Sequence, residues 1–397
     1  MSTVKGILIE GIGPIKNLKL NFNDHFNIIC GTNGIGKTTI LECIAHSFIT
    51  QPTPILKKNA DCERGKWILD VMNDMGHISE RVFHITVFEP YVSSHPLQLD
   101  YYFTAEEIIV FKSRRDIEYR MVKGIESDPL RKKENNSSLA LLGIDSNNLK
   151  TWFINRYLWS AHENVLTLDQ RNNFDLAKSI FSILDPDITF HSVIPTNDIL
   201  VKTPTGIIYY EYLSSGYKSA LSVLLGIITE IEFRFKNPRI NVTDFDGIII
   251  IDELDLHLHP EFQTAIYKGL KKIVPSAQVF TTTHSPHIIQ VAEPDEIIAL
   301  EISPEDKMIR QKNLSYNSVG YKGWTLEEIL TEVAGLKDTK SQEYYEKLQC
   351  FDTYMDNEDV KGATEAYKEL KKILHPRNEI IRLMEIQLAG LGVVIND

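Results

Sequence analysis

The sequence contains few cysteines, and their spacing excludes the structures that cysteines usually build. Only four occur among 397 residues, without any CxxC pair: Cys30, Cys43, Cys62 and Cys350. Disulfide-stapled domains and zinc sites need closely or regularly spaced cysteines. We therefore expect free thiols in a reducing compartment.

Long hydrophobic runs are also missing. No apolar stretch approaches the roughly 20 residues that a helix needs to cross a bilayer. The N-terminal residues MSTVKGILIEG lack the charged-then-apolar pattern of a secretion signal. The sequence therefore predicts a cytoplasmic protein without membrane contact.

Positive charge is outweighed by negative charge. Lysine and arginine total 42 against 54 aspartate and glutamate residues, which gives a formal net charge of -12. Proteins that coat nucleic acid are usually basic, so a DNA contact would need a local patch or a partner. The runs Arg131-Lys132-Lys133 and Lys271-Lys272 could touch a phosphate backbone, although such runs are more often solvated surface.

Patterns for a coiled-coil arm and for a built-in nuclease are absent as well. No heptad repeat is long enough for such an arm. Outside the nucleotide motifs described below, we find no serine nucleophile elbow and no spaced carboxylate pair. No acidic Toprim pattern follows His284. A nuclease of that kind is therefore not expected in this chain.

The strongest motif present is a phosphate-binding loop. Residues 31–38, GTNGIGKT, match the pattern GxxxxGK[ST] after a short apolar run and before a segment of helical periodicity. Glycines let backbone N–H groups surround a phosphate at a helix N-terminus. A chance glycine turn is the alternative, which this context disfavours. The predicted nucleotide-binding residues are Asn33, Gly34, Ile35, Gly36, Lys37, Thr38 and Thr39.

Two side chains of this loop have expected chemical roles. Lys37 supplies a positive charge to the β- and γ-phosphates of ATP and is counted among the catalytic residues. The Thr38 hydroxyl is a predicted ligand of Mg²⁺.

A second motif places two acids at the end of an apolar strand. Residues 247–253, GIIIIDE, predict a buried parallel strand, and ligands bind at the carboxyl ends of such strands. Asp252 would hold Mg²⁺ through water, and Glu253 would polarise the water that attacks the γ-phosphate. Together with the phosphate-binding loop, this strand predicts nucleotide hydrolysis.

Two further segments indicate the class of ATPase. Residues 213–219, LSSGYKS, resemble the signature turn of ABC ATPases, where serine and glycine at a helix start grip the γ-phosphate. The corresponding residues here are Ser214, Ser215 and Gly216. Residues 279–284, VFTTTH, end in His284, which matches the arrangement of a catalytic switch histidine; a buried structural histidine is the alternative.

The motifs in this order resemble the ABC ATPase superfamily, and the wording IDELDLHLHP with TTTHSPHII resembles its RecF, SMC and OLD-like branch. Residues 323–336, GWTLEEILTEVAGL, are similar to the tail of bacterial ATPases that include the ATPase subunit of Septu-type antiphage systems. The signature here lacks the usual second glycine and the glutamine. Ser215 and Lys218 stand near those positions.

This resemblance implies a homodimer or a higher homo-oligomer that holds ATP head to tail, between Lys37 of one copy and Ser215 of the other. It assigns residues 254–260 to a loop at the dimer seam, which we favour over metal binding by His257 and His259. No glutamine loop is spelled out. Ser113-Arg114-Arg115 is our candidate for the segment that senses the γ-phosphate, and a solvated basic pair is the equal alternative.

The expected fold is an α/β ABC ATPase head, a P-loop NTPase, with an antiparallel β-subdomain, an α-helical inserted region and a small all-helical C-terminal tail. We expect the ATPase core at residues 1–50 and 206–305, an inserted β and helical region within the ATPase head at 51–205, and a helical tail at 320–397. Strand patterns fall at 67–72, 82–88 and 108–111, helical patterns at 152–159 and 174–184, and a loop at 126–138.

Two functions are compatible with these motifs. The first is an ATPase, with ATP and Mg²⁺ as cofactors, that regulates a separately encoded nuclease of the HNH type in bacterial antiviral defence. The alternative is a RecF-like DNA repair ATPase that binds DNA directly. A transporter subunit is disfavoured because nothing in the sequence is directed to a membrane.

Overall fold

The computed structural model spans residues 1–397 and describes all of them except 50, 95–104, 114, 116, 315–319 and 394–397. The chain divides into two compact units, Met1–Gly335 and Leu336–Asp397. The sequence predicts a helical tail from residue 320 onward. Residues 320–335 instead belong to the first unit, because Ile329 and Val333 are buried in its core.

A mostly parallel sheet forms the centre of the first unit. Its order is β13-β12-β3-β11-β10-β6, in which only β13 runs antiparallel to its neighbour. The α/β prediction is thus confirmed. The strand bounds are β3 Phe26–Cys30, β6 Ile108–Phe111, β10 Ile248–Ile251, β11 Gln278–Thr282, β12 Ile297–Ile302 and β13 Ile309–Gln311.

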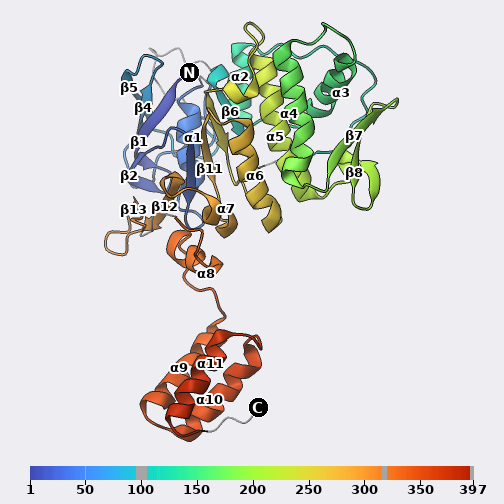
Figure 1. Ribbon diagram of the computed structural model, residues 1–397. Helices are drawn as coiled ribbons and strands as arrows, with labels where there is room; N and C mark the ends of the chain where they lie inside the picture. Colours follow the sequence, from blue (N-terminus) through green and yellow to red (C-terminus); the bar gives the residue numbers. More distant parts are fainter. Residues whose placement is uncertain (50, 95–104, 114, 116, 315–319, 394–397) are drawn as a thin grey trace. The chain divides into compact units, whose positions relative to one another are not determined.

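An antiparallel sheet of order β2-β1-β4-β5 lies on one side of the central sheet, with α1 (Lys37–His46) packed between them (Figure 1). This is the expected antiparallel subdomain. Its strands are β1 Thr3–Ile12, β2 Ile15–Asn21, β4 Gly65–Met72 and β5 Ile78–Ile85. The strands β4, β5 and β6 fall in the range 51–205, which the sequence assigns to a region inserted within the head, and they join the two sheets of that head.

Helices cover the opposite face of the central sheet (Figure 1). They are α3 Leu149–Ser160, α4 Leu168–Leu184, α5 Ser215–Arg234 and α6 Pro260–Ile273, accompanied by the antiparallel strands β7 Thr189–Ile194, β8 Asp198–Thr203 and β9 Gly206–Tyr209. The prediction of a loop over 126–138 is wrong from residue 133 onward. A helix, α2 (Lys133–Leu142), forms there, and its Ala140 is buried in the core around α1, a tertiary contact that the polar local sequence does not indicate.

The four isoleucines of β10 bury this strand on both faces, so the polar residues of the motif can stand only at its end. Ile248 and Ile250 point into the core around α1, whereas Ile249 and Ile251 point into the core under α4 to α6. A strand buried on both faces must be apolar at every position. Asp252 and Glu253 follow at the carboxyl end of this strand, beside the end of β11.

Short helices complete the first unit, and a small helical unit follows. The former are α7 (Pro286–Val291), α8 (Leu326–Glu328) and a π-helix at Ile329–Val333. The second unit contains α9 (Gln342–Asp356), α10 (Val360–Ile373) and α11 (Glu379–Gly390), which bury Phe351, Leu370 and Leu388 in a common core. Within the described ranges, no helix is both long and apolar enough to cross a bilayer.

Candidate nucleotide site

The phosphate-binding loop joins the end of β3 to the start of α1, as the motif predicts. Gly36 has a φ of 98°, and a Cβ atom there would lie 2.9 Å from Ile15 Cγ1. Glycine is therefore required both by backbone conformation and by space. Ile35 is buried and anchors the loop to the core, while Asn33 and Gly34 are exposed. The loop thus presents its backbone to solvent on a fixed base.

Lys37 lies inside this loop. Its Nζ donates to the carbonyl oxygens of Gly31 and Thr32, each at 3.0 Å. Burial lowers the pKa of the ammonium, and the nearby Asp252 and Glu253 carboxylates counter that effect. An ammonium has three donors, so it can hold two carbonyls and still reach a phosphate oxygen.

Thr38 and Asp252, the two predicted metal-binding residues, are brought together across 214 residues of chain. The Thr38 hydroxyl lies 3.2 Å from Asp252 Oδ2, and the Thr282 hydroxyl donates to Asp252 Oδ1 at 2.7 Å. Hydroxyl and carboxylate oxygens are ligands that Mg²⁺ prefers, usually together with waters and substrate phosphates. This pair therefore fits a metal that bridges the protein and a nucleotide.

Glu253 follows directly, with an unusual backbone. Its φ is 52°, in the left-handed region that residues other than glycine seldom adopt. The Glu253 N–H donates to the Thr282 hydroxyl at 2.7 Å. Thr282 therefore contacts both acids of the motif, a connection that the sequence analysis did not foresee. In the sequence, the run of three threonines at 281–283 is the feature that indicates hydroxyl contacts at this position.

His284 is held beside these acids by Asp255. Asp255 Oδ1 accepts from the Thr283 hydroxyl at 2.6 Å and from the His284 N–H at 3.2 Å. Burial lowers the pKa of His284, and the positive charge of Lys37 acts in the same direction. The imidazole is therefore predominantly neutral at pH 7, and its electrostatic neighbours are the residues of the nucleotide motifs.

The signature turn opens α5. The side chain of Ser214 caps this helix by accepting from the Tyr217 N–H at 3.2 Å. Ser214 and Ser215 are exposed, whereas Gly216 is buried. A Cβ atom on Gly216 would lie 2.6 Å from the His257 carbonyl oxygen, so glycine lets the signature helix approach the loop after Glu253. That loop exposes His257 and His259.

The basic runs weighed for DNA contact are partly engaged within the protein. Arg131 pairs with Glu230, and its guanidinium lies over the Phe233 ring. Lys271 Nζ lies 2.6 Å from Glu296 Oε1 and over the ring of Tyr267. These two cations therefore contribute less to an open positive surface than their sequence context suggests.

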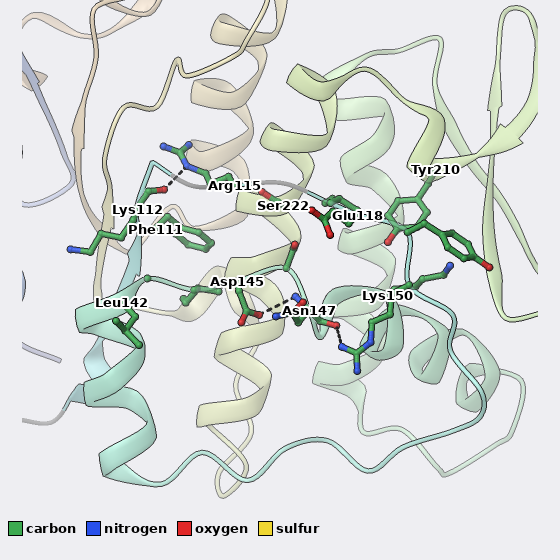
Figure 2. Close-up of a pocket in the computed structure, with 16 residues that line it drawn as sticks. Phe111, Lys112, Arg115, Glu118, Leu142, Asp145, Asn147, Lys150, Tyr210 and Ser222 are labelled. Atoms are coloured by element: carbon green, nitrogen blue, oxygen red, sulfur yellow. Dashed lines mark hydrogen bonds between the residues drawn. The ribbon is translucent and has the colours of Figure 1, made fainter.

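The segment proposed to sense the γ-phosphate lies beside a cavity of about 490 Å³, whose lining includes Phe111, Lys112, Lys150 and Tyr210 (Figure 2). Arg114 falls outside the described residues. Arg115 is buried, and it donates to the backbone carbonyls of Asp252 and Glu253. The alternative of a solvated basic pair is therefore wrong for Arg115.

Taken together, the site fits a nucleoside triphosphate with a divalent cation. A glycine-dependent loop, a lysine inside it and a helix N-terminus supply groups for phosphate, and Thr38 with Asp252 supplies oxygen ligands for Mg²⁺. This fold and this site define a P-loop ATPase with the head architecture of the ABC class.

Comparisons with known proteins narrow this class to a family. Family models described as an AAA ATPase domain and an AAA domain match residues 146–289 and 7–180. The Septu protein PtuA of Bacillus thuringiensis is 41% identical over an alignment of 401 positions that covers 100% of both chains. The chain therefore belongs to the Septu PtuA family.

More distant similarities are partial. The Retron Ec83 probable ATPase of Escherichia coli is 32% identical over 157 residues, which cover 38% of this chain and 28% of that protein. The Smc head domain derived from Pyrococcus furiosus, solved with the C-terminal domain of ScpA, is 16% identical with a TM-score of 0.46, over 79% of this chain and 97% of that one.

Proposed function

We propose that two copies of this ATPase close head to tail on ATP and Mg²⁺, and that this closure regulates a separately encoded nuclease in bacterial antiviral defence. Lys37 would hold the β- and γ-phosphates, with the loop residues Asn33 to Thr39 around them. Thr38 and Asp252 would hold Mg²⁺. Glu253 would polarise the attacking water, and His284 would stabilise charge that develops on the γ-phosphate.

One observation carries the proposal of closure between copies. Ser214 and Ser215 stand exposed at the N-terminus of the 20-residue helix α5, where helix N–H groups favour an anion. The phosphate-binding loop already supplies one set of phosphate ligands within the chain. A second exposed turn with serine hydroxyls is explained if it contacts the nucleotide held by another copy.

The nuclease partner is supported by the family and by the sequence. The chain covers the full length of a Septu protein and carries no nuclease pattern of its own. We propose that the partner is an HNH-type nuclease whose activity depends on the nucleotide state of the dimer. Purification from the native operon tests this: a nuclease should accompany the ATPase, and deletion should increase phage sensitivity. Absence of both an accompanying nuclease and a change in phage sensitivity would contradict the proposal.

Sedimentation with Mg²⁺-ATP tests closure between copies. Glu253→Gln should retain ATP, hydrolyse it at least about 100-fold more slowly, and accumulate as a dimer. Ser215→Arg, added to Glu253→Gln, should bind ATP as a single chain without dimerising. Ser276→Arg is the matched control. Ser276 is exposed just before the first residue of β11, whereas the nucleotide motifs lie at the carboxyl end of that strand.

Two results would contradict this proposal. Normal hydrolysis by Glu253→Gln would remove Glu253 from its role. A dimer that survives Ser215→Arg, or one that is lost equally in Ser215→Arg and Ser276→Arg, would contradict the placement of the signature turn at the interface. Lys37→Ala should abolish ATP binding and thereby provides the nucleotide-free reference.

A further inference from the structure

Arg115 belongs to neither the phosphate-binding loop nor the acidic strand, yet it contacts the backbone of the acidic motif. It is 9% exposed, and its guanidinium donates through Nη2 to the backbone carbonyl of Asp252 and, at 2.8 Å, to that of Glu253. Its Nε donates to the Lys112 carbonyl at 2.9 Å, the bond drawn as a dashed line in Figure 2. One planar side chain therefore ties the segment after β6 to the peptide units on both sides of the Glu253 Cα.

These peptide units need support. Glu253 is left-handed at φ 52°, a conformation that persists only where the surroundings determine it. Thr282 holds the Glu253 N–H, and Arg115 holds the carbonyls before and after the Glu253 Cα. The backbone from which the Glu253 carboxylate projects is thus fixed from two sides, by the end of β11 and by the segment after β6.

We propose that Arg115 is a positioning residue for ATP hydrolysis, which acts by fixing the backbone of Glu253. This inference rests on the proposed role of Glu253. A guanidinium is suited to the task because its donors lie in one rigid plane and can serve several carbonyls at once, which a lysine ammonium on a flexible chain does less well.

The surroundings of Arg115 extend the connection to the phosphate-binding helix. Lys112, whose carbonyl binds Arg115, forms an ion pair through its side chain with Glu42 of α1. Burial lowers the pKa of Arg115 to about 10, with the carboxylates of Asp252, Glu253 and Asp255 acting against that shift, so the side chain remains charged at neutral pH. Arg115 therefore contacts the acidic motif directly and α1 through Lys112, and it is one of the residues that line the cavity of Figure 2.

Steady-state kinetics on Arg115→Lys and Arg115→Met would test this role. Misplacing a catalytic group by about 1 Å can cost about 100-fold in rate. We expect kcat to fall about 100-fold in Arg115→Met and less in Arg115→Lys, with KM for ATP and equilibrium ATP binding changed no more than about twofold. Loss of ATP binding in Arg115→Lys, or failure of that conservative variant to fold, would overturn the proposal in favour of a purely structural role.

A double-mutant experiment tests whether Arg115 acts through Glu253. In a Glu253→Gln background, Arg115→Lys should cause little further loss of the residual single-turnover rate, because residues that act as a unit are not additive. An undiminished further loss would show that Arg115 acts elsewhere. If Glu253→Gln hydrolyses normally, the proposed function itself fails, a result distinguishable from failure of Arg115 alone.

Arg234 offers a matched control. It is also a buried arginine that donates to backbone carbonyls, those of Ala105 and Ile108 at the opposite end of β6. Arg234→Lys should lower the melting temperature while leaving kcat per folded molecule within about twofold of the wild-type value. An equal fall of kcat in Arg234→Lys and Arg115→Lys would overturn the assignment of a specific positioning role.

Discussion

At the scale of single residues, burial changes the chemistry of two ionisable side chains on α1. Glu42 and His46 are both buried, one helical turn apart, and His46 Nδ1 donates to the Glu42 backbone carbonyl at 2.8 Å. Burial raises the pKa of Glu42, and it lowers the pKa of His46 to about 4. The packing of α1 between the two sheets therefore favours the uncharged forms of both side chains.

His46 predicts a pH-dependent loss of stability. Its folded pKa of about 4 lies below the ordinary value of 6.5, so the unfolded state binds the proton first as pH falls. The free energy of unfolding should decrease between pH 6.5 and pH 4, by about 3 kcal/mol from this group, and not further below pH 4. Urea denaturation of the wild type and of His46→Asn across this range would measure it.

His46→Asn is a useful comparison because an amide can still donate to the Glu42 carbonyl but does not titrate. Contributions of other groups, including Glu42, are present in both proteins and largely cancel. If wild type and His46→Asn lose stability in parallel between pH 6.5 and pH 4, the buried histidine is not responsible.

At the scale of secondary-structure elements, β11 connects the acidic motif to the rest of the site. Two neighbouring threonines at its end both donate to residues of the β10 segment. Thr281 donates to the Ile251 carbonyl at 2.8 Å, whereas Thr282 donates to the Asp252 carboxylate at 2.7 Å and accepts from the Glu253 N–H. The first contact is with strand backbone, and the second is with the predicted metal-binding and water-polarising residues.

This difference predicts distinct effects of two similar substitutions. Thr281→Val and Thr282→Val should each destabilise the protein by about 1–3 kcal/mol, because each leaves buried polar groups without a partner. Only Thr282→Val should also reduce the added stability that Mg²⁺-ATP provides, which depends on ligand affinity. Thermal unfolding with and without Mg²⁺-ATP would show this, and equal ligand-induced shifts in both variants would contradict it.

At the scale of the whole molecule, the division after Gly335 separates a large α/β unit from a small helical one. The second unit has its own core of residues buried within its helices: Tyr344, Phe351, Ala363, Tyr367, Leu370, Ile381, Met384 and Leu388. Domains near this size are marginally stable but many fold alone. The unit therefore has the features of an independent domain.

Residues 336–397, produced as a fragment, should be helical and unfold in one cooperative transition. The reason is that its apolar stripes are buried against one another within the unit. Circular dichroism at increasing temperature would measure this transition. A gradual, non-cooperative loss of helicity would show that the unit depends on the remainder of the chain, and Leu370→Asp should produce that behaviour as the reference.

Several features of the fold and site could be predicted because neighbouring residues determine them. The glycine spacing of residues 31–38 fixes a loop that opens a helix, and the isoleucines of 248–251 require a strand buried on both faces. The order of the motifs indicated the head fold. Helical periodicity likewise predicted the tail, although its first residue was placed at 320 instead of 336.

Other features were decided only by tertiary structure. Arg115 and Asp252 lie 137 residues apart, so no local pattern could pair the Arg115 guanidinium with the Asp252 carbonyl. The same reason explains why the sequence does not predict which sheet each of β4, β5 and β6 joins, and why it predicts a loop where α2 begins. The sequence by itself determined which chemical groups this protein carries at the ends of its strands, because periodicity and loop geometry are local. Which buried arginine and which threonine hold the backbone of Glu253 depended on the packing of distant segments, since those contacts exist only when the sheet has formed.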